Sequence, residues 1–305
     1  MTAMRVTTSQ SFDRPSLMMA SLTRQADQFQ TQVATGKKIL APSDSASGWQ
    51  QLASLKRAGA DDTAYGANIA TAQGLLAATD AALSSVETQL QRAKALAVQA
   101  GSDTLSDADR QAVLEDVDAI IDDLLAIANS KDSRGHPLFG GASGDTAYAR
   151  GADGSIAYVG TGDAAAIPVG DGVAMVATTS GDRAFGGIAA PGGTTDMFAI
   201  LTALAAALQS DAEAGGIGTA MDDLDAALDQ IGTTRASVGA RAFRLDLEAE
   251  RLGDAEIARE ATRSGIEDAD TATSIAELQK TLTILQATQA SFTKLTSLSL
   301  FDYLR

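Results

Sequence analysis

Apolar residues near the start of the chain recur at intervals of three, four or seven positions. They are Phe12, Met19, Leu22, Ala26, Phe29 and Val33. This spacing places them on one face of an α-helix, in the pattern of a coiled-coil seam. Gly36 marks the expected end of this helix, and Pro42 marks a turn after it.

Two further helices are predicted before the middle of the chain. The first runs from about Ser45 to Ala100 and ends at Gly101. Its later seam consists of Leu76, Leu83, Val86, Leu90, Ala93 and Ala97. Ser106, with Asp109 three residues later, indicates the capped start of the next helix. That helix has the seam Val113, Val117, Ile120, Leu124 and Ile127.

The last third of the chain returns to the helical pattern. We expect helix from about Asp196 and, after a break at residues 215–218, almost to the end of the chain. Its seam consists of Val238, Ala242, Leu245, Ala249 and Leu252, followed by Ile275, Leu278, Leu282, Leu285 and Phe292. The terminal seams have no partner within their own segments. We therefore expect the two chain ends to lie side by side.

The middle of the chain has a different pattern. Short β-prone runs at Tyr148, 156–160, 166–170 and 173–179 are separated by Gly and Asp. Of the 28 glycines, 15 fall within residues 135–193, whereas residues 43–136 contain no proline. The predicted fold is mainly α: a long antiparallel helical rod or coiled coil formed by both chain ends, with a small inserted β domain in the middle.

Composition excludes several classes of function. The net charge of −16 argues against binding to nucleic acid, which requires clustered Lys and Arg. The absence of cysteine excludes disulfides, thiolate catalysis and cysteine-based zinc sites. No apolar run resembles a cleaved signal peptide or a membrane span, which fits either the cytoplasm or export without signal cleavage.

Candidate catalytic and metal-binding residues are few. The single histidine, His136, lies in SRGHPLF and is expected to be a turn residue. The acidic pairs at 61–62, 122–123 and 222–223 cannot each form a two-carboxylate site, because adjacent helical positions point about 100° apart. GADGS at 151–155 and GDG at 170–172 are expected to be hairpin turns. We therefore expect no enzymatic activity, cofactor or metal.

Four stretches resemble the superfamily of flagellins and hook-associated proteins. They are VATGKKILAPSDSASG at 33–48, the segment 93–113, ANSKDSRGHPLFGG at 128–141 and the segment 266–304. The ending LSLFDYL is similar to that of the hook-associated branch, whereas flagellins usually end near QVLSLLR. Ser45, Ala46 and Trp49 depart from the family pattern.

The resemblance implies a division into five segments. Residues 1–44 and 263–305 would pair as a terminal coiled coil, 45–135 and 193–262 would form a helical rod, and 136–192 a β-rich domain. The assembly interface would include Phe12, Met19, Leu22, Phe29, Val33, Ile275, Leu278, Leu282, Leu285, Phe292, Leu295, Leu298, Phe301 and Leu304.

The resemblance also implies partners and a location. The chain would be exported by the flagellar type III pathway from the cytoplasm and would assemble outside the cell with identical subunits. Hook-associated protein 1 and flagellin would be its neighbours, and a chaperone of the FlgN kind would hold the C-terminal helix before export. No contact with nucleic acid or membrane is implied.

Three functions stay open on the sequence. The favoured one is a structural subunit at the junction between hook and filament, and the second is a filament-forming flagellin. The third is a surface glycan-binding protein of the same family. It is less favoured because Phe139, Tyr148, Tyr158 and Phe185 are the only aromatic residues in the middle region that could stack on sugars.

Overall fold

A computed structural model describes residues 8–101, 106–190, 193–209 and 215–302 of the chain. The chain divides into two compact units. The terminal unit comprises residues 1–60 and 255–305, and the central unit comprises residues 61–254. Two long helices, α2 (Ala46–Ala100) and α6 (Gly215–Glu267), contribute residues to both units.

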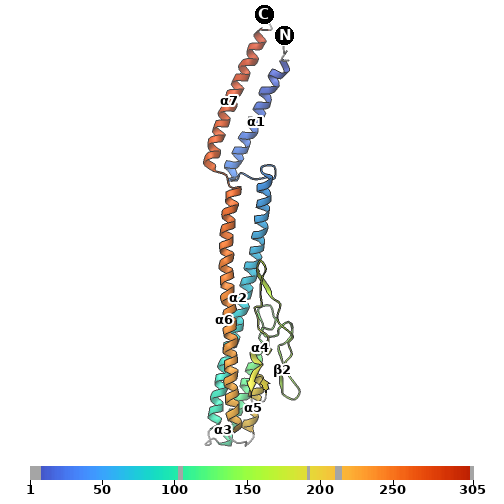
Figure 1. The fold of residues 1–305 in the computed structure, drawn as a ribbon, viewed down its shortest axis with the longest axis vertical. Coiled ribbons are helices and arrows are strands. Elements are labelled where there is room, and N and C mark those ends of the chain that lie inside the picture. The colour runs from blue at the N-terminus through green and yellow to red at the C-terminus, as the bar shows by residue number, and fades with distance from the viewer. Residues whose placement is uncertain (1–7, 102–105, 191–192, 210–214, 303–305) are drawn as a thin grey trace. The chain divides into compact units, whose positions relative to one another are not determined.

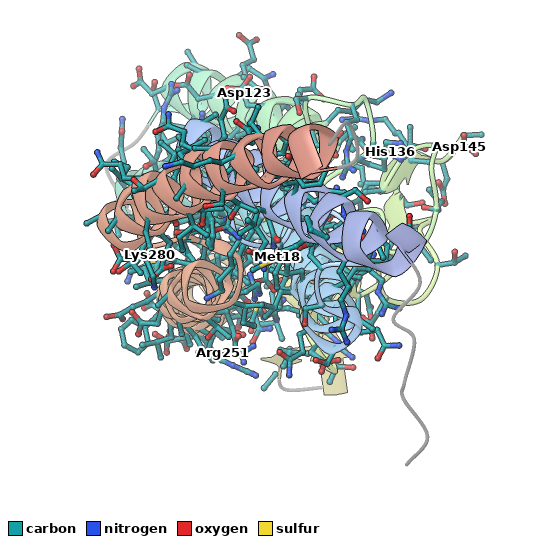
Figure 2. The ribbon with its side chains drawn as sticks, turned by 90° about the horizontal axis from the view of Figure 1, so that it is seen from above. Met18, Asp123, His136, Asp145, Arg251 and Lys280 are labelled. Carbon is teal, nitrogen blue, oxygen red and sulfur yellow. The ribbon has the colours of Figure 1, made fainter. Side chains whose placement is uncertain are left out.

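The terminal unit contains an antiparallel pair formed by α1 (Thr8–Thr35) and α7 (Thr271–Asp302), as Figure 1 shows. The predicted end of the first helix is confirmed, because Gly36 adopts φ +69° and its N–H donates to the carbonyl of Gln32 at 2.8 Å. The prediction that the two chain ends lie side by side is also confirmed.

The seam between α1 and α7 follows the heptad spacing on both helices. On α1, Leu22 and Ala26 are buried, and Met19, Phe29 and Val33 are half-buried. The inner face of α7 consists of Ser274, Leu278, Thr281, Leu285, Thr288 and Phe292, all buried or half-buried. Its two most buried positions are therefore polar.

Two predictions for the last third of the chain are wrong: the helical break at residues 215–218 and the uninterrupted helix after it. Residues 215–218 begin α6, so they do not interrupt it. The helix then ends at Glu267 and resumes as α7 at Thr271. The restart is capped by Asp270, whose carboxylate accepts hydrogen bonds from the N–H groups of Ala272 and Thr273 at 3.0 and 3.1 Å.

The central unit packs α2 and α6 with α3 (Asp107–Ala128) and α5 (Met197–Gln209) around one apolar core. All six predicted seam residues of α2 are at most 1% exposed, which confirms that seam. The predicted start of α3 is also confirmed. The hydroxyl of Ser106 accepts from the N–H of Asp109 at 3.3 Å and donates to its carboxylate at 2.6 Å.

Ion pairs add to this core at its surface. Arg235 of α6 bridges Asp80 and Glu87 of α2 at 3.0 and 2.6 Å. The guanidinium is 32% exposed, and exposed pairs contribute about 0–1 kcal/mol each. A fully buried Leu contributes about 1.5–3 kcal/mol. The apolar seams therefore account for most of the attraction between α2 and α6.

The β-rich region consists of three antiparallel hairpins in the described residues. They are β1 (Tyr148–Arg150) with β2 (Ile156–Tyr158), β3 (Ile167–Gly170) with β4 (Val173–Met175), and β5 (Ile188–Ala190) with β6 (Gly193–Thr195). The first two pairs confirm the predicted strands. The third was not predicted, and a short helix, α4 (Gly181–Phe185), precedes it.

The hairpins share their core with the helices of the central unit. Tyr148 contacts Phe198 of α5 with ring centroids 5.0 Å apart, and Phe139 contacts Phe185 at 4.8 Å. Asn129, which caps the end of α3, donates to the carbonyl of Tyr148 and accepts from its N–H, both at 3.0 Å. One side chain thus fixes the start of β1 to the end of α3.

The core of the central unit leads to a testable difference between two positions on α2. Leu83→Ala should destabilise this unit by about 2–5 kcal/mol, because it leaves a cavity at a fully buried position. Val98→Ala, at a side chain that is 55% exposed, should change stability by less than about 0.5 kcal/mol. Urea unfolding followed by circular dichroism measures both. Equal effects would contradict the position of the core.

Candidate functional site

The predicted interface residues of α1 form the inner face of the terminal pair. Met19, Leu22, Phe29 and Val33 all lie on this face. Phe12 lies in helical backbone, but its side chain is outside the described part of the structure. These first-helix residues therefore share one face, and α1 packs against α7 of the same chain.

The predicted residues of α7 separate into two groups. Leu278, Leu285 and Phe292 lie on the inner face, whereas Ile275 and Leu282 are each 42% exposed. These two exposed residues are seven positions apart and so lie on nearly the same side of the helix. The side chains of Leu295, Leu298 and Phe301, and all of Leu304, are outside the described residues.

The sequence interpretation missed two sets of residues. Leu17, Met18 and Ile284 are exposed apolar side chains on the terminal helices, at 69%, 55% and 40%. Conversely, Ser274 and Thr281 are buried, and the Ser274 hydroxyl lies 3.4 Å from the side-chain oxygen of Gln32. The heptad position of Ser274 and Thr281, three or four residues from Leu278 and Leu285, could have revealed them.

The terminal pair is connected to the long helices by two linkers, residues 36–45 and 268–270. With the adjoining turns we call residues 36–48 and 260–270 the joint. The N–H of Lys38 donates to the carbonyl of Glu267 at 2.7 Å, and the N–H of Ala269 donates to the carbonyl of Gly36 at 2.8 Å. Both linkers of the joint are therefore held together by backbone hydrogen bonds.

A charged cluster surrounds this backbone pairing. The ammonium of Lys37 lies 2.6 Å from the carboxylate of Glu267, which also pairs with Arg263. Arg263 pairs in addition with Glu260, at 2.8 Å, and the ammonium of Lys38 donates to the carbonyl of Gly265 at 2.8 Å. The hydrogen bond from Lys37 is the largest influence on Glu267 and holds the pKa of its carboxyl below the ordinary value.

Capping side chains fix the turn that leads into α2. The carboxylate of Asp44 accepts from the N–H groups of Leu40 and Ala41 at 2.8 and 2.9 Å, and these bonds lower its pKa. The hydroxyl of Ser45 accepts from the N–H of Gly48 at 3.1 Å. A Cβ at Gly48 would lie 2.5 Å from Cδ1 of Ile39, so glycine lets the buried Ile39 pack on this turn.

The residues considered for catalysis or metal binding have structural positions. The prediction for His136 is confirmed: it lies in an exposed turn, and its N–H and carbonyl both bond to Asp132. Residues 151–155 and 171–172 connect hairpin strands, as predicted for the turns. Within the described ranges, no three acidic or histidine side chains are grouped as metal ligands, and no helix could cross a membrane.

Comparison with known proteins identifies the family. The family model of the bacterial flagellin N-terminal helical region matches residues 16–143, and that of the C-terminal helical region matches residues 221–304. These two regions together cover most of the chain, which therefore belongs to the bacterial flagellin family.

The chain is similar to individual proteins of this family. The chain is 28% identical to flagellar hook-associated protein 3 of Escherichia coli (strain K12) over 296 residues, 89% of this chain and 90% of that protein. It is 27% identical to flagellin of Listeria monocytogenes over 256 residues, 83% of this chain and 82% of that protein. The crystal structure of the flagellar junction protein FlgL from Legionella pneumophila shares the fold, with a TM-score of 0.60 at 14% identity, covering 71% of this chain and 99% of that one.

The contact between Ile39 and Gly48 gives a test of the joint. Gly48→Ala should lower the free energy of unfolding of the terminal unit, measured by thermal denaturation, by about 1–3 kcal/mol, because its methyl group collides with Ile39. Ile39→Val removes the colliding carbon and should restore much of the loss in the double variant. Gly74→Ala, which meets no atom within 4 Å in α2, is the control and should not destabilise the protein. A failure of rescue would contradict the described packing.

Proposed function

We propose that this protein is a non-catalytic structural subunit of the bacterial flagellum that assembles at the junction between hook and filament. The observation that carries this proposal is the similarity to flagellar hook-associated protein 3 along 89% of the chain. The fold shared with a flagellar junction protein supports it.

The terminal helices support a role in assembly. Leu17, Met18, Ile275, Leu282 and Ile284 are exposed apolar side chains on α1 and α7, while Ser274 and Thr281 occupy the inner face. Exposed apolar groups of this kind are unfavourable in water and become buried when copies of a subunit pack together. We infer that the outer face of the terminal pair contacts neighbouring subunits.

This proposal includes the partners and the route of export. Identical copies would be lateral neighbours, with hook-associated protein 1 on one side of the junction and flagellin on the other. The chain would leave the cytoplasm unfolded through the flagellar type III pathway, after a chaperone of the FlgN kind releases its C-terminal helix. The lack of cysteine is compatible with export of an unfolded chain, because no disulfide can form before export.

A filament-forming flagellin is the second candidate, because the chain is also 27% identical to a flagellin. Gold-labelled antibody against residues 138–188 would distinguish the two on isolated flagella. A narrow band between hook and filament would support the junction subunit, and label along the whole filament would identify a flagellin. Absence of label from intact flagella, with hook and filament both present, would refute both candidates.

The exposed face of α7 gives a sharper assembly test than its inner face. Leu285 is half-buried on the inner face, so Leu285→Asp would also disturb the pair itself. Leu282→Asp should leave helicity unchanged but reduce incorporation into flagella at least about tenfold, the equivalent of about 1.4 kcal/mol at one contact. Incorporation is measured by quantitative blotting of purified flagella.

Thr283→Asp is the matched control, since it adds the same charge at an exposed position of α7 without removing an apolar side chain. It should incorporate nearly as well as the natural chain. Normal incorporation of the Leu282 variant would show that this face is not the interface.

A further inference from the structure

The joint contains five carboxylates and three cations, so its net charge changes sign when the carboxylates are protonated. Its cations are Lys37, Lys38 and Arg263, which stay charged throughout the acidic range. Its side-chain anions are carboxylates, which lose their charge in acid. Glu260, Glu267 and Asp268 are the carboxylates nearest to the cations, and Asp44 and Asp270 cap the two turns.

The elements packed against the joint offer few other charges. Residues 46–55 at the start of α2, 28–35 at the end of α1 and 271–276 at the start of α7 contain no charged residue. On α6, Arg259 directly precedes Glu260 and approaches Gly59 of α2. On α7, Glu277 pairs with Lys280 at 3.2 Å. Protonation of the joint carboxylates would thus leave its three cations close together with no nearby anion to replace the lost ones.

In the part of the chain that the structure describes, few contacts hold the linkers together. Two backbone hydrogen bonds, at 2.7 and 2.8 Å, join them, and the Lys38 ammonium donates to the carbonyl of Gly265 at 2.8 Å. The Lys37–Glu267 contact at 2.6 Å joins residues 230 positions apart. Asp44 and Asp270 fix the turns as acceptors, for backbone N–H groups and, at Asp270, also for the Thr273 hydroxyl, and a neutral carboxyl is a weaker acceptor than a carboxylate. Loss of charge therefore weakens the pairing and both caps together.

We propose that the joint is an acid-released latch: protonation of Glu267 and its neighbouring carboxylates frees the two linkers, so that the α1–α7 pair reorients on the adjoining turns of α2 and α6 while the helices stay folded. This inference concerns the isolated chain and does not rest on its place in the flagellum.

The direction of the pH effect follows from the ionisation of these groups. Hydrogen bonds from Lys37, and from Arg263, place the pKa of Glu267 below its ordinary 4.5, and a hydrogen bond from Arg263 does the same for Glu260. A carboxyl with a lowered pKa in the folded state stabilises the structure above its ordinary pKa, and this stabilisation is lost as the pH falls through the lowered value. The latch therefore holds above pH 4.5 and opens below it.

The central unit responds to mild acid in the opposite way. It contains 29 Asp and Glu residues and 11 Lys and Arg residues, so its first protonations reduce self-repulsion. Its core consists of apolar residues that do not titrate. The joint should consequently open at a higher pH than the one at which the helices of the central unit unfold.

The chain provides its own reporter for the test. Trp49, its only tryptophan, is the next residue after the joint and is 39% exposed. Between pH 7 and 3, Trp49 emission should shift to longer wavelength before the far-ultraviolet circular dichroism signal of the helices decreases. A second reporter is a pair of spin labels. Because the chain has no native cysteine, the double variant Gln30→Cys and Gln50→Cys can be labelled at these two exposed positions alone, one on α1 and one on α2. Their distance distribution should be narrow at pH 7 and at least twofold broader at pH 3.5.

Two variants separate the latch from general acid unfolding. Glu267→Gln removes the charge at nearly constant size and should broaden the spin-label distribution already at pH 7, with helicity retained. Glu248→Gln removes a carboxylate that pairs with Arg251 in the central unit and should leave the distribution narrow. A narrow distribution for Glu267→Gln at pH 7, or simultaneous loss of Trp49 signal and helicity in the natural chain, would overturn the proposal.

Discussion

The structure depends on antiparallel packing between helices from opposite ends of the chain. In the terminal unit this packing joins α1 to α7. In the central unit, α2 and α6 contribute to one apolar core and are bridged by Arg235. A single long helix with an apolar seam is marginal in water, because most helical stability in proteins comes from burial of the apolar face. Helices from the two halves of the chain therefore stabilise one another over more than a hundred residues of sequence, and hydrogen bonds of the joint connect the two linkers of the terminal unit.

Burial of apolar side chains stabilises the two units to different extents. The seam of α2 consists of Leu, Val and Ala that are almost completely buried, and α3, α5 and the hairpins cover it further. The seam of the terminal pair has only two helices, and Ser274 and Thr281 take two of its most buried positions. Far less apolar area is removed from water there, so the central unit can support a stable fold while the terminal pair requires additional contacts.

The sequence predicted those features that follow from local periodicity. The seams of α1, α2 and α3, the glycine at position 36 and the Ser106 cap all depend on residues a few positions apart. The restart at Thr271 was missed because no proline marks it and the nearest glycine, Gly265, lies inside α6. The turn there is held by hydrogen bonds to Gly36 and Lys38, which are remote in sequence. For the interface, Ile275 and Leu278 both fit a helical seam, and only the position of α1 decides which one faces inward.

In the proposed assembly, the arrangement on α7 would let one sequence serve as both monomer and polymer. A terminal pair with Leu or Ile at 274 and 281 would bury more apolar area within the chain and hold its two helices together more strongly. Apolar residues at 275 and 282 contribute little to that pair, since each remains 42% exposed, but they are available to another subunit. In the proposed assembly, this distribution would stabilise the polymer more than the single chain.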